Sequence, residues 1–199
     1  MKIVVYGDIH GRWTKVNNIA RHENAPGIST GDLGNYNYGE KFPLWFTPGN
    51  HDSEKAVSDF LAEKGNIRPI EAGKFYCLED GAKFAGLPGI FSEFMFNNTN
   101  LPNRPRKYFS RKDIEAMQNL NGIDILIFHE APCGIGLKKN NQELGSEIVR
   151  ELIAKIQPKI AFCGHHHLLH ASNIGNTKVF CLPQPNRAYM ILETSDFSV

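Results

Sequence analysis

Five short polar blocks, each following an apolar stretch or a turn, constrain this chain more than any other feature. They are rich in glycine, aspartate and histidine. In chain order they are Asp8-x-His10, Gly31-Asp32, Gly49-Asn50-His51-Asp52, His129 and Gly164-His165-His166-His167. Ligands of α/β proteins bind beyond the carboxyl ends of the strands, so blocks distant in sequence can meet at one site.

Short runs rich in β-branched residues alternate with helical patterns, which predicts an α/β protein. Strands are expected over residues 2–6, 42–47, 68–70, 74–78, 83–87, 123–128, 159–163, 178–182 and 188–192. Helices are expected over residues 15–23 with Thr14 as N-cap, from Ser53 to about 64, after Ser110, and over 143–156. Turn residues favour an antiparallel meander over 67–91, and asparagines and prolines predict a loop over 92–109.

Length and composition predict one soluble domain over residues 1–199. The 22 basic and 21 acidic residues exclude a globally basic nucleic-acid binder. The apolar runs are far shorter than the roughly 20 residues of a membrane span, so no membrane partner is expected. The four cysteines show no CxxC pair, which predicts reduced, mostly buried thiols and a cytoplasmic location.

The side chains of the five blocks supply a coherent set of metal donors. They are Asp8, His10, Asp32, Asn50, His129, His165 and His167. Mixed nitrogen and oxygen donors without a thiolate suit Mn²⁺, Fe or Zn²⁺ at a catalytic site. Seven donors are too many for one four-coordinate ion and suit two ions that share a bridge. The neighbouring glycines let the backbone bend tightly beside such ions.

The order D-x-H, G-D, G-N-H-D, H and G-H-x-H resembles the signature of the calcineurin-like metallophosphoesterases. All five blocks are present in order and span most of the chain, from Asp8 to His167. The resemblance implies a four-layer α-β-β-α sandwich with two mixed sheets flanked by helices. It also implies a centre with two divalent metal ions that hydrolyses phosphate esters.

The resemblance implies a role for each matching residue. The first ion would be held by Asp8, His10, Asp32 and His167, and the second by Asp32, Asn50, His129 and His165. Asp32 would bridge the two ions. His51 would contact the substrate phosphate and assist the leaving group, and Asp52 would orient the His51 ring.

Two further comparisons refine the family resemblance. Many relatives carry a second Asp or an Arg a few residues after the G-D block, whereas here Leu33-Gly34-Asn35-Tyr36 follows Asp32. This departure argues against the protein Ser/Thr phosphatase branch. Residues 86–91 and 111–115 are similar to the middle of RNA lariat-debranching enzymes. Those enzymes are much longer and carry a Cys where Asp8 stands.

A basic stretch before the helix at Ser110 is a candidate for contact with the substrate. It contains Arg104, Arg106, Lys107, Arg111 and Lys112, with Tyr108 and Phe109 between them. The first three are the predicted substrate-binding residues, since cations and aromatic rings together suit nucleic acids. The alternative is a solvated basic surface, as charge runs usually are.

The favoured hypothesis is a phosphodiesterase that uses two divalent ions, Mn²⁺ first, to act on nucleotides or nucleic acid. The competing enzyme hypothesis is a small-molecule phosphomonoesterase or a cyclic-nucleotide phosphodiesterase. The remaining alternative is a metal-binding scaffold that recognises a partner protein through the aromatic residues near Phe94. The sequence leaves the native metal, the oligomeric state and the substrate open.

Overall fold

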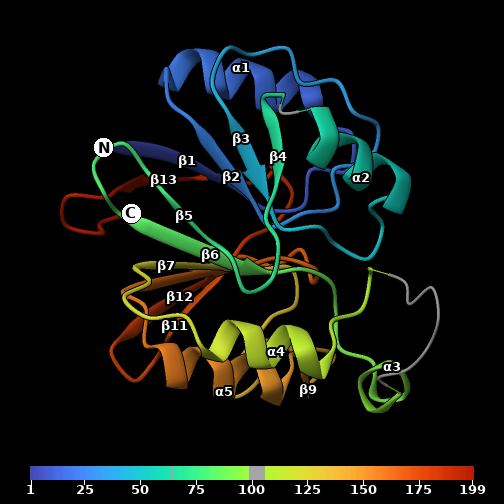
Figure 1. Cartoon of the computed structure of the whole chain (residues 1–199). Coiled ribbons are helices and arrows are strands. Elements are labelled where there is room, and N and C mark those ends of the chain that lie inside the picture. Colours follow the sequence, from blue (N-terminus) through green and yellow to red (C-terminus); the bar gives the residue numbers. More distant parts are fainter. Residues whose placement is uncertain (64, 99–105) are drawn as a thin grey trace.

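Two β-sheets packed face to face form the centre of the molecule (Figure 1). This computed structural model describes residues 1–63, 65–98 and 106–199. The first sheet has the order β13 (Met190–Glu193), β1 (Lys2–Tyr6), β2 (Gly27–Ser29), β3 (Leu44–Phe46) and β4 (Ile67–Pro69). The second has the order β11 (His170–Ile174), β12 (Thr177–Cys181), β10 (Ile160–Cys163), β7 (Ile125–Phe128), β6 (Lys83–Leu87) and β5 (Phe75–Cys77).

Helices cover the outer face of each sheet. In Figure 1, α1 (Trp13–Glu23) and α2 (Glu54–Glu63) lie above the first sheet, and α4 (Arg111–Gln118) and α5 (Glu147–Ile156) lie below the second. The short helix α3 (Glu93–Asn97) stands at the side, and β8 (Lys138–Lys139) and β9 (Gln142–Glu143) form a small hairpin. The predicted sandwich of two mixed sheets flanked by helices is confirmed.

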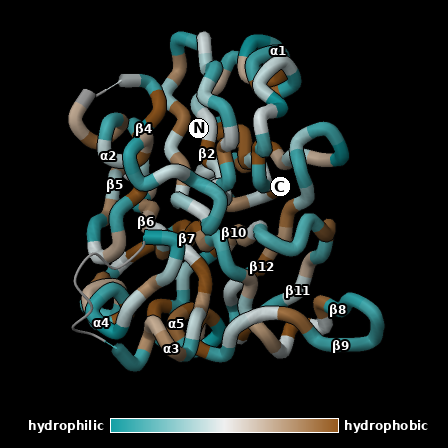
Figure 2. The backbone as a smooth tube through the Cα atoms, turned by 90° about the vertical axis from the view of Figure 1, so that its right-hand side faces the viewer, coloured by the Kyte–Doolittle hydropathy of each residue, from teal (hydrophilic) through white to brown (hydrophobic). Residues whose placement is uncertain are grey.

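Alternation of side chains along the buried strands explains why four layers form. On β1, Ile3 and Val5 point into the core between the sheets, whereas Val4 and Tyr6 pack under α1. The strand β7 divides its side chains between the two cores in the same way. Successive side chains of a strand face opposite sides, so strands buried on both faces are apolar throughout. In Figure 2 the hydrophobic segments follow these central strands.

Strand direction sets where the polar blocks lie. The strands β1 to β4 are mutually parallel, as are β6, β7, β10 and β12, and the antiparallel strands lie at the sheet edges. The loops that follow β1, β2, β3, β7 and β10 therefore leave the sheets at their carboxyl ends. These are the loops that carry the polar blocks, as expected for an α/β site.

The predicted meander is partly wrong. The strands β5 and β6 form an antiparallel pair, but β4 pairs in parallel with β3 in the other sheet. Four strands, β2, β8, β9 and β11, are not among those predicted. The strand β11 alternates half-buried and exposed residues of mixed polarity, so its sequence lacks the apolar period of a core strand.

Two predicted helices begin at other residues in the structure, and one helix was not predicted. Helix α1 begins at Trp13 after Arg12, two residues earlier than a Thr14 cap implies. A short helix capped by Ser92 lies inside the predicted loop. Helix α5 begins at Glu147, because the residues before it form the β8–β9 hairpin. The predicted helix after Ser110 is confirmed, and Ser110 and Asp113 form a capping box at its start. The predicted end of α2 at residue 64 lies outside the described residues.

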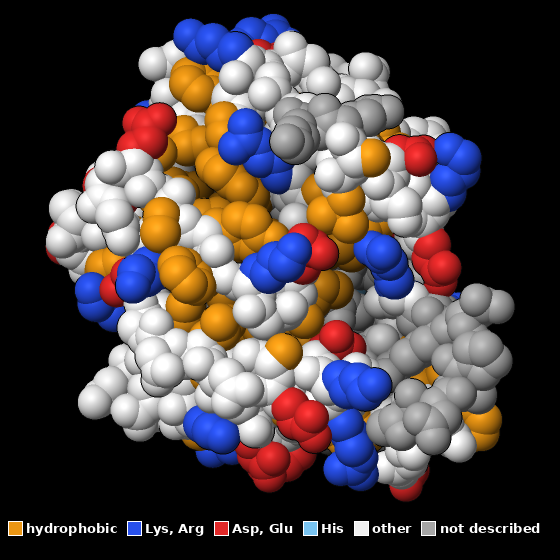
Figure 3. Space-filling model, viewed as in Figure 1, with side chains coloured by type: hydrophobic (Ala, Val, Ile, Leu, Met, Phe, Trp, Pro, Cys, Tyr) orange, Lys and Arg blue, Asp and Glu red, His pale blue; other side chains and the backbone are white. Residues whose placement is uncertain are grey.

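One face of the molecule carries hydrophobic side chains at its centre. Figure 3 shows hydrophobic side chains across the middle of this face, and Phe75 on β5 is 51% exposed.

Among the described residues, no helix has the length and apolarity that a membrane span requires. All four cysteines are free thiols, but Cys77 is exposed and Cys133 half-buried, so the expectation of mostly buried cysteines holds only for Cys163 and Cys181.

Candidate metal centre

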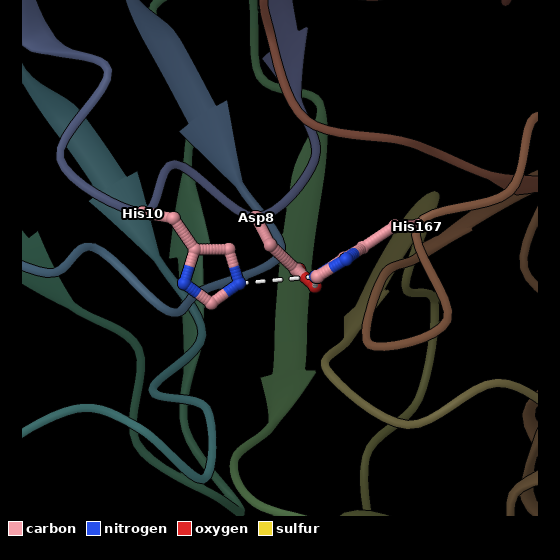
Figure 4. Close-up of side chains that lie close together, drawn as sticks. All are labelled: Asp8, His10 and His167. Carbon is pink, nitrogen blue, oxygen red and sulfur yellow. Dashed lines mark hydrogen bonds and ion pairs between the residues drawn. The ribbon is translucent and has the colours of Figure 1, made fainter.

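Three donors from two distant loops meet at the carboxyl end of β1. The Nε2 atoms of His10 and His167 lie 3.0 Å apart, and His167 Nε2 lies 3.1 Å from Asp8 Oδ2. Figure 4 shows the three side chains pointing toward one another. Asp32, on the loop after β2, lies beside them with Oδ2 at 3.6 Å from His10 Nε2. This group matches the four predicted ligands of the first ion.

A second group adjoins the first and shares Asp32. His129 Nε2 lies 3.6 Å from Asp32 Oδ2 and 2.9 Å from the side-chain oxygen of Asn50. The other ring nitrogen, Nδ1, lies 2.8 Å from the carbonyl oxygen of Thr30, which fixes the ring orientation. Asp32 Oδ2 therefore faces both groups, as a bridging carboxylate must.

His165, the remaining predicted ligand, lies next to the second group. Its ring centroid is 5.2 Å from that of His129, and its backbone N–H donates to Asp8 Oδ2 at 2.7 Å. A ring nitrogen of His165 also lies within 4.8 Å of donor atoms of Glu130 and His166. All seven predicted donors are thus brought to one region of the molecule.

The spacing of the donors fits bound divalent ions. Metal–ligand bonds of about 2.0–2.2 Å place the donors of a tetrahedral site roughly 3.4 Å apart. The atom pairs of the first group are separated by 3.0 to 3.6 Å. Carboxylate, imidazole and amide donors without a thiolate favour Mn²⁺, Fe or Zn²⁺. The residues present therefore fit a dinuclear centre.

The protonation preferences of several ligands also suit metal binding. Burial lowers the pKa of His10 and of His165, which favours the neutral imidazoles that coordinate cations. Burial alone would raise the pKa of Asp8, but hydrogen bonds from His167 and Thr30 and the nearby His129 ring lower it overall. The same contact with Asp8 raises the pKa of His167, an ion pair that a metal would replace.

The backbone is bent at the ligands themselves. His10, Asp32, His165 and His167 all have positive φ, between 43° and 64°. This region is costly for residues with a Cβ and is concentrated at functional sites. Gly164 serves another need, because a Cβ there would collide with the Asp8 carboxylate and the Thr30 hydroxyl.

His51 lies at the mouth of this centre. Its side chain is exposed, its ring centroid is 5.8 Å from that of His10, and its N–H donates to Asp32 Oδ1 at 2.8 Å. It is therefore accessible to a substrate and close to the donors. The orientation of the His51 ring by Asp52 stays a prediction.

The Asp52 carboxylate accepts hydrogen bonds from main-chain N–H groups of two loops. Its Oδ2 accepts hydrogen bonds from the N–H groups of Asp32 at 2.9 Å and Gly49 at 2.8 Å, and its Oδ1 accepts from Leu33 at 2.8 Å. Burial raises the pKa of Asp52 to about 6, despite the hydrogen bonds from Gly49 and Leu33, which lower it. Asp52 thus ties the loop that carries Asp32 to the loop that carries Asn50 and His51.

Two of the three predicted substrate-binding residues belong to the described part of the chain. Arg104 lies outside the described residues. Arg106 is exposed, and its N–H donates to Glu54 Oε1 at 3.2 Å at the start of α2. Lys107 is exposed with its Nζ 5.2 Å from the centre of the Tyr108 ring.

Glu130 is the site residue that the sequence analysis missed. It is only 8% exposed, its Oε1 lies 3.5 Å from His166 Nε2, and its Oε2 accepts from Phe91 N–H at 3.4 Å. In the sequence, only its position directly after His129 points to Glu130. Its burial results from tertiary packing, which the sequence pattern does not reveal. His166 faces this carboxylate and lies outside the two donor groups that contain Asp8.

The family model of calcineurin-like phosphoesterases matches residues 1–169. An uncharacterised protein of Haemophilus influenzae is 28% identical over 196 residues, with 83% of each chain covered.

Solved structures share the fold. TT1561 of Thermus thermophilus has a TM-score of 0.68 at 15% identity, covering 99% of this chain and 96% of that one. The phosphopantetheinyl hydrolase of Mycobacterium tuberculosis has a TM-score of 0.55 at 10% identity, covering 93% and 90% of the two chains. At these identities the likeness establishes the fold and leaves the substrate open.

Proposed function

This chain belongs to the calcineurin-like phosphoesterase family, and from that premise we propose that it is a phosphodiesterase acting on nucleotide or nucleic-acid substrates. The observation that carries the proposal is the position of Asp32, whose Oδ2 lies 3.6 Å from both His10 Nε2 and His129 Nε2. One carboxylate oxygen between two imidazoles suits a bridge between two ions.

Two bound divalent ions supply Lewis-acid activation of the phosphoryl oxygens and a nucleophile at neutral pH. We propose Mn²⁺ as the native metal on the mixed oxygen and nitrogen donors. Asp8, His10 and His167 would hold one ion, Asn50, His129 and His165 the other, and Asp32 both. The hydrogen bond from Thr30 to Asp8 Oδ1, at 2.8 Å, holds that carboxylate in place.

His51 would provide the proton chemistry. Its exposed ring lies at the edge of the donor cluster, and an imidazole can donate a proton or hydrogen bond near neutral pH. The bond from its own N–H to Asp32 fixes the backbone of His51 relative to the bridge. Asp52 then acts as a positioning residue that holds both loops.

The preference for diesters rests on the surroundings of the centre. Arg106 and Lys107 are exposed cations, and Lys107 lies over the Tyr108 ring, a combination that suits an extended nucleotide substrate. Four free thiols suit a reducing compartment, and we propose the cytoplasm as the location.

Hydrolysis of bis-p-nitrophenyl phosphate beside p-nitrophenyl phosphate, with the Mn²⁺-loaded protein, tests the proposal. We expect the diester to be the better substrate and His51→Ala to lose most of that activity. A monoester preference would instead favour a small-molecule phosphomonoesterase. Failure to hydrolyse either ester with two ions bound would favour a metal-binding scaffold.

A further inference from the structure

A cavity of about 360 Å³ opens at the carboxyl edge of the sheets, beyond the metal donors. It lies between α2 and the chain segment that leads into α4. Figure 1 shows this segment rising from α4 toward α2 at the right-hand side. The described residues that line the cavity are Pro48, Val57, Leu61, Pro69, Ile70, Glu71, Ala72, Pro88, Arg106, Tyr108, Ser110 and Asp113. We propose that this cavity binds the nucleobase of the substrate, an inference that rests on the proposed function.

Strand topology places the cavity beside the second group of donors. Pro48 follows β3, directly before the block that carries Asn50 and His51. Pro69 is the last residue of β4, which pairs with β3. Pro88 directly follows β6, which pairs with β7, and β7 ends just before His129. In each sheet, the cavity therefore lies at the carboxyl end of the strand next to one that leads into the metal donors.

Backbone hydrogen bonds connect the cavity wall to the catalytic loop. Gly89 N–H donates to the carbonyl of Pro48 at 2.8 Å, and Ile90 N–H donates to Lys107 at 2.9 Å. Ile90 and Tyr108 also form an isolated parallel bridge. Tyr108 is thus held at a fixed place relative to His51 through main-chain contacts.

The chemistry of the lining suits a flat heterocycle. Three prolines from three strand ends, with Val57 and Leu61 of α2, provide apolar walls, and Tyr108 adds an aromatic ring. Pockets that bind small molecules are mainly apolar and aromatic, with a few polar groups that set orientation. Bases stack well on aromatic side chains whatever their sequence.

The charges of the lining exclude the phosphate from this cavity. Arg106 is the lining cation among the described residues, against the carboxylates of Glu71 and Asp113. Asp113 is already engaged, because its Oδ2 accepts from Ser110 N–H at 2.7 Å and from the Ser110 hydroxyl at 2.6 Å. A cavity without excess positive charge takes the neutral part of a nucleotide and leaves the phosphate to the metal centre.

Two probes that differ only in the base test the proposal. Calorimetric titration of the Mn²⁺-loaded protein compares adenosine 5′-monophosphate with ribose 5-phosphate. We expect the nucleotide to bind about fivefold or more tightly, the lower range of one stacked base. Equal affinities, or no binding of either probe, would overturn the proposal.

Matched variants locate the effect. Tyr108→Ala should bring the nucleotide down to the affinity of ribose 5-phosphate without changing the latter, whereas Tyr108→Phe keeps the ring and the preference. Ala72→Phe fills the cavity and should act like Tyr108→Ala. Ala62→Phe, at an exposed position of α2 outside the lining, should behave as wild type.

An equal loss for both probes in Tyr108→Ala would show a structural role and contradict the base site. Hydrolysis of bis-p-nitrophenyl phosphate by the same preparations separates the two proposals. A protein that cleaves this diester but does not distinguish the probes refutes the base site alone. A protein that distinguishes the probes but prefers monoesters refutes the phosphodiesterase proposal alone.

Discussion

His10 and His167, which are 157 positions apart in the sequence, bring their Nε2 atoms within 3.0 Å of each other. Both residues have positive φ, so the chain adopts a costly conformation twice to bring two imidazoles together. Asp8 Oδ2, at 3.1 Å from His167, completes the convergence. A shared cation explains why these groups gather at one point.

Removing one of these imidazoles should weaken the binding of one of the two ions more than that of the other. We expect His167→Ala to lower the affinity for the more weakly held ion by at least about tenfold, since a ligand contributes no less than a residue that supports it. Metal titration followed by calorimetry measures this. His22→Ala changes an exposed histidine and should retain wild-type binding. Unchanged affinity in His167→Ala would contradict the ligand assignment.

Close packing at Gly164 should make even one methyl group harmful. A Cβ at this position would meet the Asp8 carboxylate and the Thr30 hydroxyl. We expect Gly164→Ala to destabilise the fold by about 1–3 kcal/mol and to weaken metal binding, because a ligand must move. Denaturant unfolding and metal titration both report the effect.

Gly39→Ala is the matched control for Gly164→Ala. A Cβ at Gly39 would have no neighbour within 4 Å, and the residue is not in a left-handed conformation. Its unfolding free energy and metal affinity should stay close to those of wild type. If Gly164→Ala and Gly39→Ala had equal unfolding free energies and metal affinities, the close approach of Gly164 to Asp8 would not matter for stability or metal binding.

Asp52→Ala should affect stability as well as activity. The substitution leaves three N–H groups, those of Asp32, Leu33 and Gly49, without their acceptor. We expect a loss of about 2 kcal/mol or more in unfolding free energy, because each unpaired buried donor costs about 1–3 kcal/mol. If Asp52 only oriented the His51 ring, unfolding would be unchanged while activity fell.

The N-terminus should make stability depend on pH through Asp80. Its carboxylate accepts from the Thr194 hydroxyl and lies 3.3 Å from the N-terminal ammonium. The hydrogen bond from Thr194, with the N-terminal charge, lowers the pKa of Asp80. A folded-state pKa below the unfolded value of about 3.9 stabilises the protein above that pH, and the effect is lost as the pH falls through the folded pKa.

Asp80→Asn measures that contribution. We expect it to lower the unfolding free energy at pH 7 by no more than about 1 kcal/mol, since the group is partly solvated. The difference from wild type in urea unfolding should shrink as the pH falls below about 4. A difference that stays constant from pH 7 to pH 3 would exclude the charge of Asp80 as its cause.

Local patterns explain which parts of the fold were predictable. The continuous apolar runs of β1 and β7 and the Ser110 capping box depend on residues that are close in sequence. The pairing of β4 with β3 is a long-range choice between two sheets, and local turn residues near residue 71 point to the wrong partner. Helix α5 starts late because Gly145, with φ of 109°, turns the chain out of the β8–β9 hairpin.

The candidate site was predictable from the sequence to about the same extent as the fold. Short polar blocks after strands predict seven donors, and the structure brings their side chains to one region because strand direction sends the blocks to one edge. The Glu130 carboxylate and the cavity beside Tyr108 arise from packing between elements, which no local pattern encodes. The same holds for the contacts of Asp52, since its three backbone partners lie on two loops that are separate in sequence.

The metal content of the protein is the most direct test of the dinuclear centre. Mass-spectrometric metal analysis should find two divalent ions per chain in wild type after Mn²⁺ loading and removal of free metal. In Asp32→Ala the loss of the oxygen that lies 3.6 Å from both His10 and His129 should reduce this to one ion or fewer. Two tightly held ions in the variant would contradict the bridge, and with it the central claim.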